Sequence, residues 1–145
     1  MTFVLDKPRL IGAILYLVVD IVYVFSSTNA YASAMKAISG QSKTDGIVAY
    51  APIAWVCMGL GWYFFAAPTA LQWAIKTNPL AAGVASGLLF GITVIGTFNF
   101  TLTAMFSKWS QIMWRDMAWG ISWATLSVTL YTLWASHNTK RGRKP

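Results

Sequence analysis

Two aspartates interrupt otherwise apolar stretches of this 145-residue chain and are its clearest candidates for chemistry. Asp20 lies within the run from 10 to 28, and Asp116 lies near the head of the run from 112 to 134. An acid inside a bilayer costs roughly 2.5–3.5 kcal/mol on insertion scales, so it marks a functional hypothesis by default. Asn99, near the end of a third apolar run, adds an amide with two donors and one acceptor to satisfy.

The helical rise places these three polar side chains at a similar depth. At about 1.5 Å per residue, each lies roughly 8–10 Å from the end of its own run. Because none is stable alone in hydrocarbon, we expect them to meet and share hydrogen bonds. Aromatic residues three to four positions away on the same helical faces would form the walls. The predicted pocket consists of Asp20, Asn99, Asp116, Tyr16, Tyr23 and Trp119.

Two interpretations of this pocket stay open. Two neighbouring carboxylates do not both ionise easily, so the pocket would hold a proton or bind a cationic ligand. The same groups would serve equally well as a hydrogen-bonded lock between helices. A single cysteine, Cys57, and a single histidine, His137, leave no set of metal ligands, and we predict neither a metal nor a cofactor.

The composition is that of a membrane protein, with 57% hydrophobic and only 10% charged residues. Soluble domains average about 25% charged residues. The formal charge of +7 does not indicate nucleic-acid binding, because the basic residues lie in short polar connections or at the C-terminus. That pattern is typical of the positive-inside rule.

The apolar runs predict an all-α fold, a four-helix transmembrane bundle forming a single domain over residues 1–145. We expect spans at about 10–28, 47–67, 80–105 and 112–134, the second ended by Pro68. A signal peptide is the rival interpretation of the first run, but the run is longer than an h-region and contains Asp20. Between the first two spans, helical spacing predicts a short interfacial helix that ends at Gly40.

Four glycines are predicted to serve helix packing. Gly83, Gly87 and Gly91 form two overlapping GxxxG motifs, and Gly120 shares the face of Asp116. Two tryptophans, Trp109 and Trp114, are interpreted as one aromatic belt at the membrane surface.

The basic residues also predict the orientation. Four spans place both termini on one side, together with seven of the eleven lysines and arginines, which favours a cytoplasmic location for both ends. The tail from 137 to 145 is expected to contact anionic lipid head groups. Its basic residues are Lys140, Arg141, Arg143 and Lys144.

Several of these residues carry a resemblance to a family of small, four-span predicted membrane proteins of unknown function. The most specific piece is an Asp-x-x-Trp-Gly block, here Asp116 to Gly120. The other matching positions are Asp20, Tyr23, Tyr31, Gly91, the run from Thr97 to Thr101, and Trp109. The chain departs from the family pattern at Asn99, where Asp is usual, at Leu102, where Asn is usual, and at Tyr23, where Trp is frequent. The resemblance implies architecture and site positions, and implies no activity.

We rank three functions from the sequence. A structural or assembly subunit comes first, packed against lipid and against a protein partner or a second copy of the chain. The alternative is a proton- or cation-coupled transporter or channel component that uses Asp20 and Asp116, with oligomerisation through the glycines at 83, 87 and 91. A membrane enzyme acting on a lipid or a quinone comes last, because the sequence offers no nucleophile–base pair.

Overall fold

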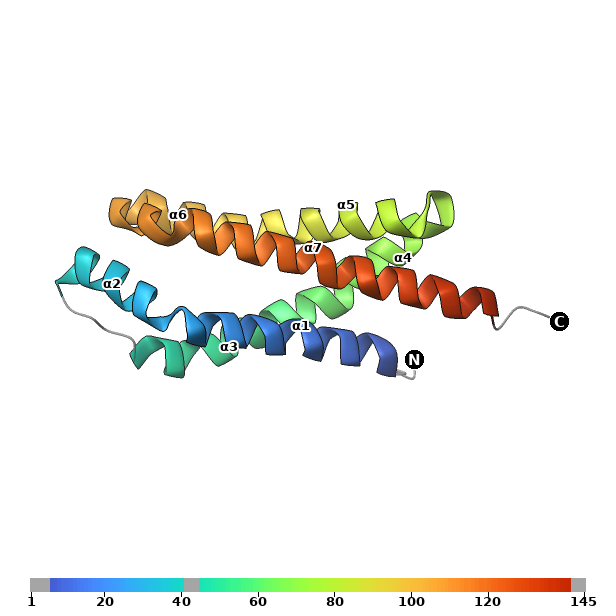
Figure 1. Cartoon of the computed structure of the whole chain (residues 1–145), viewed down its shortest axis with the longest axis horizontal. Coiled ribbons are helices and arrows are strands. Elements are labelled where there is room, and N and C mark those ends of the chain that lie inside the picture. The colour runs from blue at the N-terminus through green and yellow to red at the C-terminus, as the bar shows by residue number, and fades with distance from the viewer. Residues whose placement is uncertain (1–5, 41–44, 142–145) are drawn as a thin grey trace.

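The described part of the chain is helical throughout, apart from short connections (Figure 1). A computed structural model describes residues 6–40 and 45–141, with side chains described for 6–40 and 52–139. The α-helices are α1 (Lys7–Ser26), α2 (Thr28–Ser39), α3 (Asp45–Gly61), α4 (Ala67–Lys76), α5 (Pro79–Gly91), α6 (Thr97–Met105) and α7 (Ser110–Arg141). Two π-helical turns, η1 (Trp62–Ala66) and η2 (Ile92–Gly96), and one 3-10 turn, η3 (Ser107–Trp109), join them. The predicted all-α class is confirmed.

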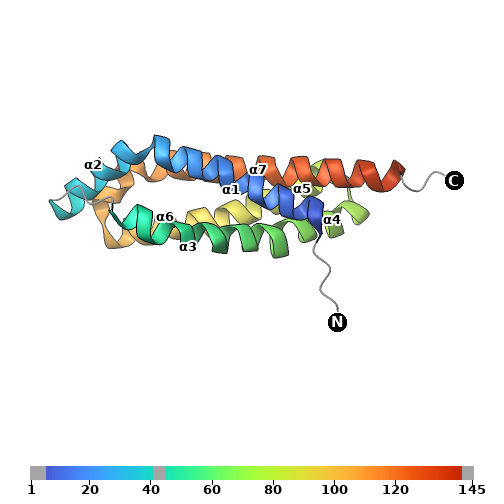
Figure 2. The same ribbon diagram turned by 90° about the horizontal axis from the view of Figure 1, so that it is seen from below.

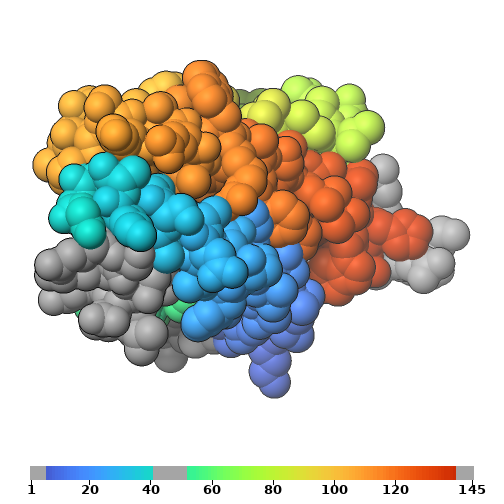
Figure 3. Space-filling view, turned by 60° about the vertical axis from the view of Figure 1, so that its left-hand side comes forward, coloured from blue at the N-terminus to red at the C-terminus, as the bar shows by residue number. Residues whose placement is uncertain are grey.

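The helices form long, roughly antiparallel rods. The segment α3–η1–α4 is one rod and α5–η2–α6 is another, each continuous through its π turn. In Figures 1 and 2, α1 begins and α7 ends toward the end of the molecule where α4 meets α5. The short helix α2 lies at the opposite end, near the connection from α6 to α7, and Figure 3 shows it lying against that part of the chain.

Within residues 6–40 and 45–141, three helical rods are long and apolar enough to cross a membrane. They are Lys7–Ser26, Pro52–Lys76 and Pro79–Met105. The predicted fourth span, 112–134, falls within α7, which has 32 residues but is not among these three. Its alternating serines, threonines and tryptophans make it less apolar than the other rods.

The second rod corrects one boundary. Pro68 was expected to end the span, but the helix continues to Lys76. The backbone N–H of Ala67 donates to the carbonyl of Trp62, five residues back, which widens the turn in front of the proline. Pro68 then occupies the first turn of α4, where a missing N–H group leaves no bond unmade.

Capping residues define the start of α5 and the end of α2. The Asn78 side chain accepts from the Ala81 N–H at 2.8 Å and begins α5. Gly40 ends α2 in the left-handed region with a φ of 76°, a conformation that glycine adopts without strain. The predicted end of the short helix at Gly40 is confirmed.

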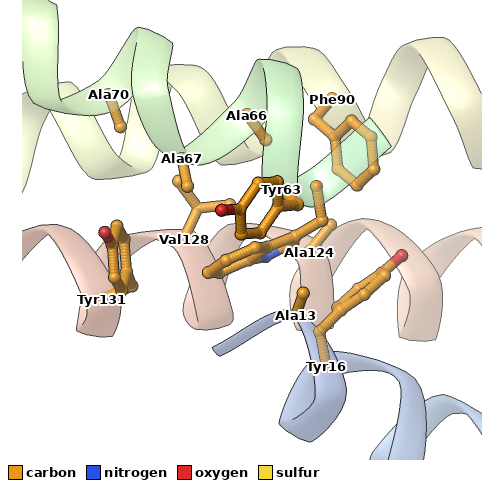
Figure 4. Packing of buried hydrophobic residues seen from close by; sticks show 11 residues of the cluster. Ala13, Tyr16, Tyr63, Ala66, Ala67, Ala70, Phe90, Ala124, Val128 and Tyr131 are labelled. Carbon is orange, nitrogen blue, oxygen red and sulfur yellow. The ribbon is translucent and has the colours of Figure 1, made fainter. Parts of the chain in front are cut away.

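The main core gathers small and aromatic side chains from α1, the α3–α4 rod, α5 and α7. Figure 4 shows Ala66, Ala67 and Ala70 together with Val128 of α7. Trp62, with no exposed surface, lies at the centre and donates from Nε1 to Ser127 Oγ at 3.0 Å. Alanines let the helices come close enough to enclose this indole.

The glycine motif of α5 packs directly on the backbone of α7. A Cβ atom added at Gly83 or Gly87 would lie 2.6 Å from the Cα of Thr129 or Thr125, and one at Gly91 would lie 2.9 Å from the Cα of Ile121. Because α7 of the same chain covers this face, the glycines are not available to a second copy. The route to oligomerisation considered from the sequence is therefore wrong.

Candidate functional site

A cavity of about 560 Å³ lies between α1, α3, η2 and α7, toward the end of the bundle that carries α2. Of the six residues predicted to form a pocket, Asp20, Tyr23, Asp116 and Trp119 line it. Gly120 also lines it, and its backbone approaches the Ile95 side chain so closely that an added Cβ would lie 2.9 Å from it. The remaining lining residues are Val24, Tyr31, Ala54, Trp55, Cys57, Met58, Val94, Ile95, Phe98 and Trp109.

Asp116 is held on both carboxylate oxygens by neutral donors. The Tyr31 hydroxyl of α2 donates to Oδ1. The Asn99 amide of α6 donates from Nδ2 to Oδ2 at 2.7 Å. One acid on α7 therefore ties together two helices that are distant in the sequence.

Asn99 lies behind the cavity wall, with no exposed surface. Its Nδ2 also donates to the Ile95 carbonyl at 3.1 Å, and its Oδ1 accepts from Trp109 Nε1 at 3.0 Å. Every hydrogen-bonding group of this amide is thereby used. The interpretation of Trp109 as part of a surface belt is wrong, because the ring is 6% exposed and its N–H group has a buried acceptor.

Asp20 has fewer partners than Asp116. It is 7% exposed, and its Oδ2 accepts from Trp55 Nε1 at 3.1 Å. Its second oxygen accepts no hydrogen bond from any described residue, although it belongs to a carboxylate that lines the cavity. The two acids of the site therefore differ: one is fully engaged and the other retains an open oxygen.

A stacked aromatic pair forms one wall. Tyr23 of α1 and Trp119 of α7 lie nearly parallel, with ring centroids 4.7 Å apart and an angle of 12° between the ring planes. The Tyr23 hydroxyl is buried and has no partner among the described residues. A buried hydroxyl without a partner is costly, and it marks a place where a bound group would supply one.

The structure places Tyr16 away from this cavity. Its ring belongs to the main core, edge-on to Phe90 with centroids 6.1 Å apart. It lines a second, apolar cavity of about 450 Å³ between α1 and α7, and the described residues that line this cavity include no acid. One helical turn of α1 separates Tyr16 from Asp20. Tyr16 packs into the aromatic core, whereas Asp20 lines the polar cavity.

The described donors to the two acids of the site are all neutral groups: a hydroxyl, an amide and an indole N–H. Among the described side chains, the ion pair is Arg9 with Asp6 at 3.1 Å, and neither Asp20 nor Asp116 forms one. In α2, burial first and the neighbouring Asp116 carboxylate next raise the pKa of Tyr31 above its ordinary range. Tyr31 therefore stays a hydrogen-bond donor at neutral and moderately alkaline pH.

The described residues contain no group of three or more His, Cys, Asp or Glu side chains that would hold a metal ion. The predicted head-group contacts fall outside the description: the side chains of Lys140 and Arg141 are not described, and Arg143 and Lys144 lie beyond residue 141.

Among the lining residues that reasoning from helical periodicity missed, three are aromatic residues with a hydrogen-bonding group, namely Tyr31, Trp55 and Trp109. Tyr31 and Trp109 are matching positions in the family resemblance, so that pattern was a signal for them. Trp55 had no signal, because nothing in the spacing of α3 indicates that its indole faces the acid on α1.

A family model described as "Predicted membrane protein (DUF2177)" matches residues 8–134. No curated protein and no solved structure matches the chain.

Proposed function

The chain belongs to this family of predicted membrane proteins of unknown function, and from that premise we propose a four-span protein that binds and releases a proton or a cation at Asp20 and Asp116. In this proposal α7 is the fourth span, α2 lies in the interface, and both termini lie on the cytoplasmic side. The sequence ranks an assembly subunit first, but the cavity supports its alternative better.

Length and packing support a spanning role for α7. A helix of 32 residues extends about 48 Å, whereas the hydrocarbon core of a bilayer is about 30 Å thick. α7 lies beside α5 in both ribbon views, in backbone contact along the glycine face. Its hydroxyls satisfy themselves locally: Thr125, Thr129 and Thr132 each donate to the carbonyl four residues back.

One observation carries the functional proposal: two carboxylates from separate helices line one cavity, and neither has a basic partner among the described side chains. A carboxylate that keeps an open oxygen in apolar surroundings is stabilised by taking up a proton or by binding a cation. Exchange between these two states is the elementary step of proton- or cation-coupled transport. Because α7 covers the glycine face, that face provides an intermolecular contact for neither function, and the cavity alone favours transport over assembly.

Proteoliposomes that contain the full chain test the proposal. Internal pyranine fluorescence would report proton entry driven by a potassium diffusion potential, with and without external sodium. We expect Asp20→Asn to lower the flux at least about tenfold, because the amide cannot take up the charge. Asp6→Asn is the matched control: this acid lies outside the cavity, and asparagine also caps a helix. Equal flux from wild type and Asp20→Asn would refute the proposal.

Purification from the native membrane at low detergent separates the two functions. A stable, stoichiometric protein partner together with flux that is indifferent to Asp20 would favour the assembly subunit. A chain that runs alone and carries Asp20-dependent flux would favour transport.

A further inference from the structure

We propose that the ligand of the Asp20–Asp116 cavity is a monovalent organic cation with an apolar body, such as an aromatic or alkyl ammonium, and that Asp20 is its counter-ion. This inference rests on the proposed function and names the class of cation that the cavity takes. It follows from the unequal engagement of the two acids, the lining of the cavity and its size.

The unequal hydrogen bonding of the acids assigns them different roles. Both oxygens of Asp116 already accept a donor, from Tyr31 and from Asn99, so this acid holds α2 and α6 in place. Of the described residues, Trp55 alone donates to Asp20, which keeps one oxygen for a ligand. Among the described residues, Asp20 supplies the one carboxylate oxygen open to a ligand, and a single ammonium group suffices to occupy it, which favours a monovalent ligand.

The lining favours an organic cation over a metal ion. Calcium takes six to eight oxygen ligands and magnesium about six, whereas the described lining residues offer one open carboxylate oxygen and the unpartnered Tyr23 hydroxyl, among rings and aliphatic side chains. Aromatic faces attract ammonium groups, most strongly when water is excluded. The aromatic residues that line the cavity are Tyr23, Tyr31, Trp55, Phe98, Trp109 and Trp119.

The volume of the cavity fits a small organic molecule better than a bare ion. Cavities that bind small organic ligands span about 300–1,000 Å³, and this one measures about 560 Å³. The second cavity has similar size and comparable aromatic content, but none of its described lining residues is an acid that would serve as the counter-ion. The Asp20 carboxylate and the aromatic lining occur together at the first cavity, which is therefore where we place the cation.

The test measures binding of benzyltrimethylammonium to the detergent-solubilised full chain. Tryptophan fluorescence reports occupancy, since Trp55, Trp109 and Trp119 line the cavity, and equilibrium dialysis with labelled ligand confirms it. Neopentylbenzene is the matched neutral probe, because it has the same shape with carbon in place of the charged nitrogen. We expect saturable binding of the cation and at least about tenfold weaker binding of the neutral isostere.

Variants assign the counter-ion. Asp20→Asn is expected to weaken binding of the cation at least about tenfold and to leave the neutral probe unchanged. Trp55→Phe keeps the ring and removes the N–H group, so we expect it to change the affinity by less than Asp20→Asn does. Asp6→Asn is expected to bind as the wild type does. Circular dichroism of each variant would verify that the helices are retained.

Three outcomes overturn the inference. They are equal affinity of the wild type for the charged probe and its neutral isostere, equal competition by sodium at matched concentration, and retention of full affinity by Asp20→Asn. The first comparison uses the wild type alone and does not depend on any variant. Asp20-dependent proton flux without binding of the organic cation would leave the proposed function standing and refute only the ligand class.

Discussion

The two halves of α7 pack against their neighbours by different means. From Ile121 onward, the backbone of α7 lies against the glycines of α5 so closely that no side chain fits between them. Before Gly120, contact is made by side chains: Asp116 accepts hydrogen bonds from α2 and α6 across a space that leaves a cavity. One helix thus combines a tight backbone contact with an open polar site. We call the tight contact the glycine seam, and it consists of Gly83, Gly87 and Gly91 of α5 against Thr129, Thr125 and Ile121 of α7.

The difference indicates how a small bundle combines rigidity with binding. Close backbone packing excludes any ligand but holds α5 and α7 in fixed register. Polar side chains are longer than glycine, so helices joined by their hydrogen bonds lie further apart than helices in backbone contact at glycines. We infer that the glycine seam is the support from which Asp116 is positioned, and the following substitutions test that division.

Breaking the seam should have the largest effect. Gly87→Ala places a Cβ 2.6 Å from the Cα of Thr125 and 3.0 Å from two carbonyl oxygens, none of which moves without the helix. We expect a loss of about 3 kcal/mol in the free energy of unfolding, measured by detergent-titrated circular dichroism. Gly96→Ala is the matched control, since its added Cβ meets only the Ile92 side chain at 3.8 Å. Equal losses at both positions would contradict a seam specific to α5 and α7.

Removing the Asn99 amide, which connects Asp116 with Trp109, should cost less stability than breaking the glycine seam. Asn99→Leu deletes the donor to Asp116 Oδ2 and the acceptor for Trp109 Nε1, leaving these two atoms without a partner among the described residues. We expect a loss of about 2 kcal/mol, because polar contacts within membranes contribute modestly each. Thermal melts in micelles would measure it. Asn138→Leu, at an exposed position on the same helix as Asp116, should leave the midpoint unchanged; an unaltered melt for Asn99→Leu would show that the network does not stabilise the fold.

The single hydrogen bond between Trp62 and Ser127, in the tightly packed half of α7, should contribute less to stability than the Asn99 contacts. Trp62→Phe keeps an aromatic ring in the core but loses the donor to Ser127 Oγ. The hydrogen bond accounts for about 1 kcal/mol of the expected loss and the smaller ring adds a cavity cost, so the same melts measure the bond through a double-variant cycle. Ser127→Ala removes the other partner, and the double variant should lose no more than the larger of the two single effects. Additive losses would mean that the bond does not couple α3–η1 to α7.

The smallest effect concerns pH. The fold favours the neutral form of Tyr31, so its contribution is complete below the unfolded pKa of about 10 and is lost as the pH rises above it. The groups that face Tyr31 are Asp116, Tyr23 and Asp20. Melting midpoints should therefore fall less steeply between pH 9 and 11 in Tyr31→Phe than in the wild type. Parallel curves would contradict a buried Tyr31 hydroxyl.

Much of the architecture could be predicted from residue patterns. The apolar runs indicated helices near 10–28 and 80–105, which correspond to Lys7–Ser26 and Pro79–Met105. The glycines at every fourth residue indicated close helix packing, and Asp20 and Asp116 stood out by charge alone. The π turns had no signal, and they explain why Pro68 does not end the second rod and why faces counted at 3.6 residues per turn drift beyond them.

Composition and spacing by themselves determined that the chain is a helical membrane protein and that two acids lie within its apolar runs. Only the tertiary structure decided that α7 covers the glycine face, that Trp55 and Tyr31 reach the acids, and that Tyr16 belongs to the core. The physical reason is that periodicity orders residues around one helix axis. The rotation and register of that helix against its neighbours come from packing, and a single π turn shifts them by one residue.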